Sequence, residues 1–83
     1  MYYLYILECA DKTLYTGITV DLDRRVREHN GSKLGAKYTK ARRPVKLVYS
    51  KRYANRSKAS IAENQIKDLN RGEKLRLISE GRK

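Results

Sequence analysis

Two tyrosine tripeptides near the start of the chain contain side chains that could do chemistry. They are Tyr3-Leu4-Tyr5 and Tyr15-Thr16-Gly17, and they are followed by Arg25 and, much later, by Glu63. Phenols can orient or deprotonate water, a guanidinium can bind phosphate oxygens, and a carboxylate can hold a divalent metal ion. Together these residue types are what a one-metal hydrolysis of a phosphodiester needs.

The composition bounds the fold and the partner. With 83 residues, of which 40% are hydrophobic, the chain has room for one domain, residues 1–83, with one small core. The formal net charge is +11. Such an excess of Lys and Arg favours a polyanionic partner, because the cations displace counterions condensed on phosphates. Composition therefore predicts contact with nucleic acid. The alternative is a basic protein whose charged surface contacts only solvent.

Cysteine usage and the amino terminus argue against other classes. Cys9 is the single cysteine, so no intramolecular disulfide can form, and the chain has no Cys/His spacing suited to zinc. The apolar run that begins at Tyr2 ends at Glu8, which is too short for a signal sequence or a membrane span. We expect a cytoplasmic protein with no membrane contact; the sequence does not predict its oligomeric state.

The two tripeptides fall on a predicted β-hairpin. Residues 2–8 are apolar or aromatic on both faces, as in a central strand, and residues 13–19 return as a second strand. A three-residue loop would pair Tyr5 with Gly17 and Leu7 with Tyr15, which puts both phenols on one face beside an open patch. A two-residue loop would put the phenols on opposite faces and abolish the site.

The elements after the hairpin must position the remaining candidates. Asp21 can cap a helix that runs to about Asn30, with Arg25 and His29 one turn apart on it. Residues 31–44 contain many cations and little apolar content, which predicts a basic loop, ordered or mobile, before a third strand over 45–49.

The last part of the chain reads as two helices. Ser57 can cap a helix over 58–70, with Glu63 at the edge of its apolar stripe. A short terminal helix would then close the core with Leu75, Leu77 and Ile78. The fold class we predict is α+β, a small three-stranded antiparallel sheet flanked by helices in the order ββαβαα.

The two tripeptides, with Arg25 at the expected interval and Glu63 on the later helix, resemble the GIY-YIG endonuclease family. Residues 35–45 are similar to a stretch of its small, single-domain YhbQ-like members. The chain departs from the family at Tyr3, which replaces a glycine, at Ile18, where some members have a lysine, and in lacking a late asparagine, since Asn70 comes too early.

The resemblance implies an endonuclease that hydrolyses DNA phosphodiesters with Mg²⁺ or Mn²⁺ held by Glu63. It implies five catalytic residues: Tyr5, Tyr15, Arg25, His29 and Glu63. We expect Tyr5 to be the base, Tyr15 its hydrogen-bond partner, Arg25 the phosphate ligand and His29 a proton relay. Taken singly, each has a structural explanation: strand tyrosines, a helix-end histidine, and charged helix residues that pair with Asp21 or Lys67.

The basic loop is the predicted nucleic-acid surface. Its cations would contact phosphates, and its tyrosine would stack on a base. The predicted contact residues are Lys33, Lys37, Tyr38, Lys40, Arg42 and Arg43.

Three functions remain open on the sequence. The leading hypothesis is a structure-dependent endonuclease for branched or single-stranded DNA, with a role in DNA repair or recombination, because the chain has no room for a sequence-reading module. The second is a catalytically weak or inactive nucleic-acid-binding module of the same fold, favoured by the residues that depart from the family. The third is a ribosome-associated RNA-binding protein, which rests on charge and size.

Overall fold

The computed structural model describes residues 1–31 and 33–81. Its elements within these ranges are, in chain order, β1 (Tyr2–Glu8), β2 (Leu14–Thr19), α1 (Leu22–Gly31), α2 (Lys37–Lys40), β3 (Lys46–Tyr53), α3 (Arg56–Lys67) and α4 (Arg71–Gly81). The predicted α+β class and the order of the main elements are confirmed. The structure adds α2, a single helical turn inside the stretch that we expected to be a loop.

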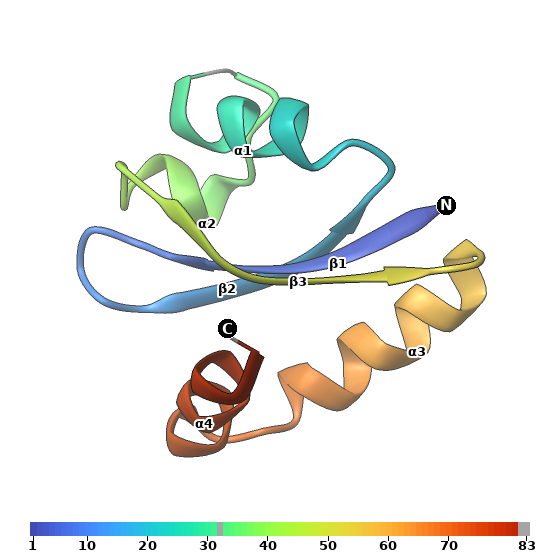
Figure 1. Cartoon of the computed structure of the whole chain (residues 1–83). Coiled ribbons are helices and arrows are strands. Elements are labelled where there is room, and N and C mark those ends of the chain that lie inside the picture. The colour runs from blue at the N-terminus through green and yellow to red at the C-terminus, as the bar shows by residue number, and fades with distance from the viewer. Residues whose placement is uncertain (32, 82–83) are drawn as a thin grey trace.

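The strands form one antiparallel sheet in the order β2-β1-β3, so β1 is central as predicted. Helices α1 and α2 cover one face of the sheet, and α3 and α4 cover the other (Figure 1). Because β1 is covered on both sides, Leu4, Ile6 and Leu7 are completely buried. This explains why both faces of the strand are apolar.

The hairpin has the register that the three-residue loop predicts. The backbone N–H of Cys9 donates to the carbonyl of Thr13 at 2.9 Å, and Lys12 in the loop adopts a positive φ of 70°. Tyr5 therefore pairs with Gly17, and Leu7 with Tyr15. Since side chains alternate between the faces of a sheet, both phenols lie on the face covered by α1 and α2.

Two apolar clusters lie on opposite faces of the sheet. Leu4 and Ile6 pack with Ala62, Ile66 and Ile78 of α3 and α4. The other cluster, on the α1 side, is built by four buried residues, Tyr5, Leu7, Cys9 and Val45, with Tyr15, Leu22 and Val26 against them. The candidate site residues thus belong to a packed cluster of their own.

Helix boundaries were predicted correctly at α1 but wrongly at α3. The carboxylate of Asp21 accepts from the N–H of Arg24 at 3.1 Å, as the predicted cap should. At α3 the cap is Asn55, whose side chain accepts from Lys58 N at 2.9 Å, so Ser57 lies within the first turn. Asn55 has the extended backbone that a cap requires, and its side chain accepts from the N–H of Lys58, which has no partner within the helix.

The end of α3 also differs, because Asn70 starts the next helix instead of finishing this one. Asn70 Oδ1 accepts from Glu73 N at 2.9 Å, and Glu73 Oε1 accepts from Asn70 N at 3.0 Å. This reciprocal capping box fixes the start of α4. On α4, Ile78 is buried and Leu77 packs on the core as predicted, but Leu75 is 41% exposed and does not close it.

β3 is longer than the strand predicted over 45–49, because β1 offers a pairing partner from Glu8 back to Tyr2.

No helix within residues 1–31 and 33–81 is long and apolar enough to cross a membrane.

Candidate active site

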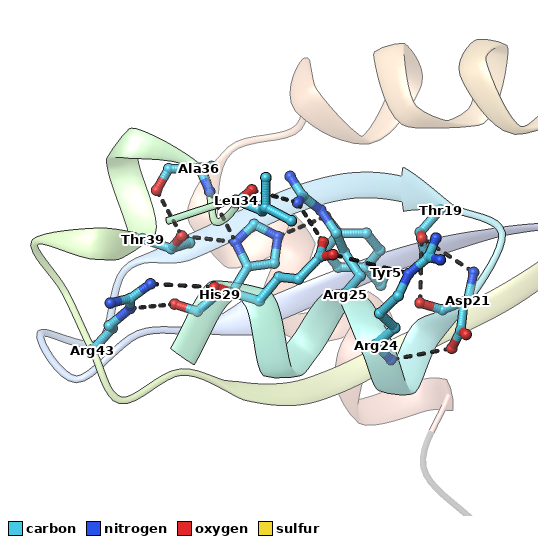
Figure 2. Close-up of polar contacts among 11 residues, drawn as sticks. Tyr5, Thr19, Asp21, Arg24, Arg25, His29, Leu34, Ala36, Thr39 and Arg43 are labelled. Atoms are coloured by element: carbon cyan, nitrogen blue, oxygen red, sulfur yellow. Dashed lines mark hydrogen bonds and ion pairs between the residues drawn. The ribbon is translucent and has the colours of Figure 1, made fainter. Parts of the chain in front are cut away.

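Three aromatic side chains from three elements meet at the centre of the site (Figure 2 shows two of them, Tyr5 and His29). The rings of Tyr5 and Tyr15 are 6.5 Å apart between centroids, and the His29 ring is 5.7 Å from Tyr5 and 5.2 Å from Tyr15. The Tyr5 hydroxyl is hydrogen-bonded to His29 Nε2 at 2.9 Å. Residues separated by up to 24 positions in sequence are thus in direct contact.

Gly17 makes room for the Tyr5 phenol. A Cβ atom at position 17 would lie 2.5 Å from Tyr5 Oη and 2.7 Å from Cζ, far inside van der Waals contact. Gly17 has no positive φ, so the requirement is for space and not for backbone freedom. The open patch that the hairpin register predicts is therefore filled by the phenol itself.

Arg25 lies beside Tyr5 and is held by two further acceptors. Its Nη1 donates to Glu28 Oε1 at 2.9 Å and to the carbonyl of Leu34 at 2.7 Å. The Arg25 side chain keeps 27% of its exposure. The contacts with Glu28 and Leu34 fix the orientation of the guanidinium, and the group still reaches solvent, which suits the binding of an anion. The expected pairing with Asp21 is replaced by the pairing with Glu28.

Burial shifts the pKa values of the central pair in opposite directions. Burial raises the pKa of Tyr5 to about 12; a hydrogen bond from Arg25 and its charge oppose the rise, and Tyr15 and Glu63 add to it. Burial, with the positive charge of Arg25, lowers the pKa of His29 to about 4. At neutral pH the phenol is therefore protonated and the imidazole is neutral, which makes them a donor and an acceptor.

The far side of the His29 ring is held by α2, through a residue that the sequence did not single out. His29 Nδ1 is 2.7 Å from the hydroxyl of Thr39, which itself donates to the carbonyl of Ala36 at 2.9 Å (Figure 2). His29 and Thr39 are both completely buried. The segment around Thr39 is part of the stretch shared with the small family members, which is the signal that could have found it.

Glu63 approaches the site from the opposite face of the sheet. Helix α3 packs against β1 and β2, and the charge of Glu63 is close enough to add to the rise in the pKa of Tyr5. Its carboxylate, 17% exposed, pairs with Lys67 at 3.4 Å, the i,i+4 contact expected on the helix. Within the described ranges, no three His, Cys, Asp or Glu residues cluster as metal ligands. A metal bound here would have Glu63 as its carboxylate and water for most other ligands, which suits Mg²⁺.

The predicted nucleic-acid surface divides into exposed and structural residues. Lys33, Lys37 and Lys40 are exposed. Tyr38 stacks on Tyr15 with centroids 5.9 Å apart, and the guanidinium of Arg42 lies 3.9 Å above the Tyr38 ring. The basic segment is thus joined directly to the aromatic cluster of the site.

Arg42 and Arg43 also hold the fold together. Arg42 pairs with Asp11 at 3.0 Å, which ties the segment after α2 to the hairpin loop. Arg43 donates to the carbonyls of His29 at 2.6 Å and Glu28 at 3.2 Å, near the end of α1. The side chain of Asn30, which the sequence did not single out either, accepts from the N–H of Val45 at 2.7 Å and donates to the carbonyl of Val45 at 2.9 Å.

The departures at positions 18 and 70 fall outside the cluster. Ile18 pairs with Leu4 and packs on the α3 side, so a lysine there would point away from Tyr5. Asn70 caps α4. Tyr3 is half-buried on the same face as Tyr5 and borders a cavity of about 290 Å³ with residues 20–23.

Comparisons with known proteins bear on the family and the fold of this chain. The chain matches the model of the GIY-YIG catalytic domain over residues 1–76. A UPF0213 protein of Syntrophus aciditrophicus (strain SB) is 56% identical over 78 residues, which are 94% of this chain and 90% of the relative. The solution NMR structure of the UPF0213 protein BH0048 from Bacillus halodurans has a TM-score of 0.61 and 44% identity, covering 95% of this chain and 84% of that chain. The solution NMR structure of the protein EF2693 from E. faecalis has a TM-score of 0.62 and 37% identity, covering 94% of this chain and 83% of that chain.

Proposed function

This chain belongs to the GIY-YIG family, a family of nucleases, and from that premise we propose that it is a metal-dependent endonuclease that hydrolyses DNA phosphodiester bonds. The observation that carries the proposal is the contact of Tyr5 Oη with His29 Nε2 at 2.9 Å beside Tyr15 and Arg25. A buried phenol needs a hydrogen-bond acceptor in any case, and here that acceptor is an imidazole, which can itself take up a proton. Here the phenol has a group to which it can pass its proton.

Tyr5 serves as the base in this proposal. It takes a proton from the attacking water while its own proton moves to His29 Nε2, so the phenol stays neutral overall. Because the pKa of Tyr5 is raised, very little of the phenol is ionised before substrate binds, so Tyr5 can act as a base only if its proton leaves as the water is deprotonated. A phosphate bound at Arg25 would neutralise a charge that lowers the pKa of His29, so the imidazole becomes a better acceptor when substrate is present. Tyr15 packs against both rings and orients the water.

Arg25 binds the phosphate. Within the described part of the chain, two of its five N–H donors are used by Glu28 and Leu34, and one by Tyr5. Two remain for the non-bridging oxygens, where charge develops in the transition state.

Glu63 would hold Mg²⁺ or Mn²⁺, and the ion would polarise the phosphate and stabilise the leaving oxygen. Its carboxylate is 17% exposed, and its charge is close enough to Tyr5 to add to the rise in the pKa of that phenol, since α3 packs against both β1 and β2. Lys67 now neutralises this carboxylate, so its ion pair would have to open for the metal to bind.

The substrate we propose is branched or single-stranded DNA, met in repair or recombination in the cytoplasm. The basic surface, made of Lys33, Lys37, Tyr38, Lys40, Arg42 and Arg43, would contact the backbone next to the site. Phosphate contacts position a nucleic acid but do not read its sequence. Cutting should therefore depend on DNA structure more than on base sequence.

The test is cleavage of labelled branched, single-stranded and duplex DNA with Mg²⁺, Mn²⁺ or EDTA. We expect cutting that needs the metal and is lost in Glu63→Gln, while the control Glu80→Gln, which removes an exposed carboxylate of an i,i+4 pair on α4, cuts normally. Equal cutting by Glu63→Gln and the wild type would indicate a contaminant. Equal cutting of a linear and a branched duplex would contradict the proposed substrate.

The second candidate is a binding module of the same fold with little or no hydrolysis. The pairing of Glu63 with Lys67 favours it, because a neutralised carboxylate binds a cation weakly. Arg25→Ala separates the two, with Arg27→Ala on the same helix as the control. For an enzyme, Arg25→Ala removes cutting with a small loss of binding. Tight DNA binding by the wild type without cutting under any metal condition supports the binding module.

A further inference from the structure

The hydrogen bonds around His29 determine which of its nitrogens carries the proton. Neutral imidazole has one N–H donor and one acceptor nitrogen. Thr39 Oγ1 lies 2.7 Å from Nδ1 and 2.9 Å from the carbonyl of Ala36, and a carbonyl can only accept. If the hydroxyl proton points to Ala36, Thr39 must accept from His29, and Nδ1 bears the hydrogen.

This arrangement gives each of the short bonds from Tyr5 through His29 and Thr39 to the Ala36 carbonyl one donor and one acceptor. Nε2 then has its lone pair towards Tyr5, 2.9 Å away, and accepts the phenol proton. Tyr5 is 1% exposed, so its proton needs a partner inside the protein. The Arg25 guanidinium donates to the Tyr5 oxygen, which has lone pairs left to accept it.

The opposite tautomer leaves a buried group unmatched. With the hydrogen on Nε2, His29 would donate to Tyr5, and the phenol proton would have no acceptor among the hydrogen bonds of residues 1–31 and 33–81. Thr39 would also give up its bond to Ala36 in order to donate to Nδ1. The gain would be a contact from Ala36 N at 3.5 Å, too long for a strong bond. An unsatisfied buried hydroxyl costs more than that contact returns.

We propose that Thr39 is a positioning residue, which holds His29 in the Nδ1–H tautomer and thereby makes Nε2 the acceptor for the Tyr5 proton. Free histidine favours the other tautomer, so the protein has to impose this one. When the phenol proton moves to Nε2, the imidazolium has a hydrogen on each nitrogen, and the one on Nδ1 stays bonded to Thr39. The catalytic part of this inference rests on the proposed function, whereas the tautomer does not.

His29 is the chain's only histidine, so one imidazole can be observed directly in the untagged protein. The ¹⁵N shifts and the ring couplings of labelled histidine separate Nδ1–H, Nε2–H and imidazolium. In the wild type at pH 7 we expect the Nδ1–H form. In Thr39→Val, which keeps the branched shape but removes the hydroxyl, the Nε2–H form should gain population. Thr39→Ser should restore the wild-type spectrum.

Cleavage by the same three proteins tests the consequence. Thr39→Val should cut about 10- to 100-fold more slowly, in kcat more than in KM, and Thr39→Ser should stay near the wild type. An Nε2–H spectrum in the wild type would overturn the inference even if the valine variant does not fold. An unchanged tautomer in a folded Thr39→Val would overturn it too. The expected spectra in a protein that cuts no DNA would confirm the role of Thr39 in setting the tautomer and refute the proposed function.

Discussion

Replacing Gly17 by alanine puts a methyl group against the Tyr5 phenol. The new Cβ would lie 2.5 Å from Oη and 2.7 Å from Cζ, whereas carbon atoms in contact are usually about 3.5–4.0 Å apart. Tyr5 has little freedom to retreat, because it is 1% exposed and its hydroxyl is bonded to His29. Either the ring or strand β2 must shift.

The size of the effect follows from two contributions. Overpacking a filled core costs about 1–3 kcal/mol. If the ring shifts enough to break the bond to His29, a buried group is left unsatisfied, at about 1–3 kcal/mol more. We therefore expect Gly17→Ala to lower the free energy of unfolding by about 1–3 kcal/mol if the bond to His29 survives, and by about 2–6 kcal/mol if it breaks. Either loss is a large part of the 5–15 kcal/mol typical of a domain.

Urea denaturation followed by circular dichroism measures this loss, against Gly31→Ala as the matched control. Position 31 has open space around it: among the described residues, apart from its chain neighbours and the backbone of its own helix, no atom lies within 4 Å of a Cβ there. Alanine at the end of α1 should leave stability unchanged or raise it by up to about 1 kcal/mol. If Gly17→Ala costs no more than Gly31→Ala, the phenol does not occupy the space beside Gly17 and our account of the site is refuted.

A double-mutant cycle with Tyr5→Phe tests the atom involved. Removing Oη takes away the closest contact of the new methyl group, so the combined variant should be less destabilised than the sum of the two single variants, by about 1 kcal/mol or more. Additive costs would show that the methyl group clashes with something other than the phenol oxygen.

Two further predictions concern charge. Since the pKa of His29 is lowered to about 4, the unfolded chain, with its histidine near 6.5, binds more protons between these values. The contribution of His29 to the free energy of unfolding is therefore fully present above about pH 6.5 and falls by up to about 3 kcal/mol as the pH drops to 4. Urea denaturation should show this fall for the wild type but not for His29→Gln. Parallel curves of stability against pH for the two proteins would contradict the prediction. Lys37→Ala/Lys40→Ala should weaken DNA binding and reduce the slope of log affinity against log salt by about 0.9 for each duplex phosphate that the variant no longer neutralises. Arg71→Ala/Arg76→Ala on α4 removes the same charge from the other side of the sheet, and an equal change of slope there would argue against a localised surface.

The amino-acid sequence by itself determined that residues 2–8 and 13–19 form a hairpin. Side chains alternate with a period of two, so the loop length decides which residues share a face; the sequence left a two-residue and a three-residue loop open, and the register in the structure put Tyr5 and Tyr15 on one face. The Asp21 cap follows from equally local chemistry. Family resemblance supplied the order of Arg25, His29 and Glu63, which periodicity does not reveal.

Only the tertiary structure decided how the site is held. In the sequence, Thr39 is an ordinary polar residue and Arg43 an ordinary cation. In the structure, packing buries Thr39 against His29, and Arg43 donates to carbonyls near the end of α1. The choice of Asn55 over Ser57 as a cap depended on which residue becomes extended where β3 ends. These outcomes come from contacts between segments far apart in the chain, where most buried donors find an acceptor, and no window of sequence records which acceptor that will be.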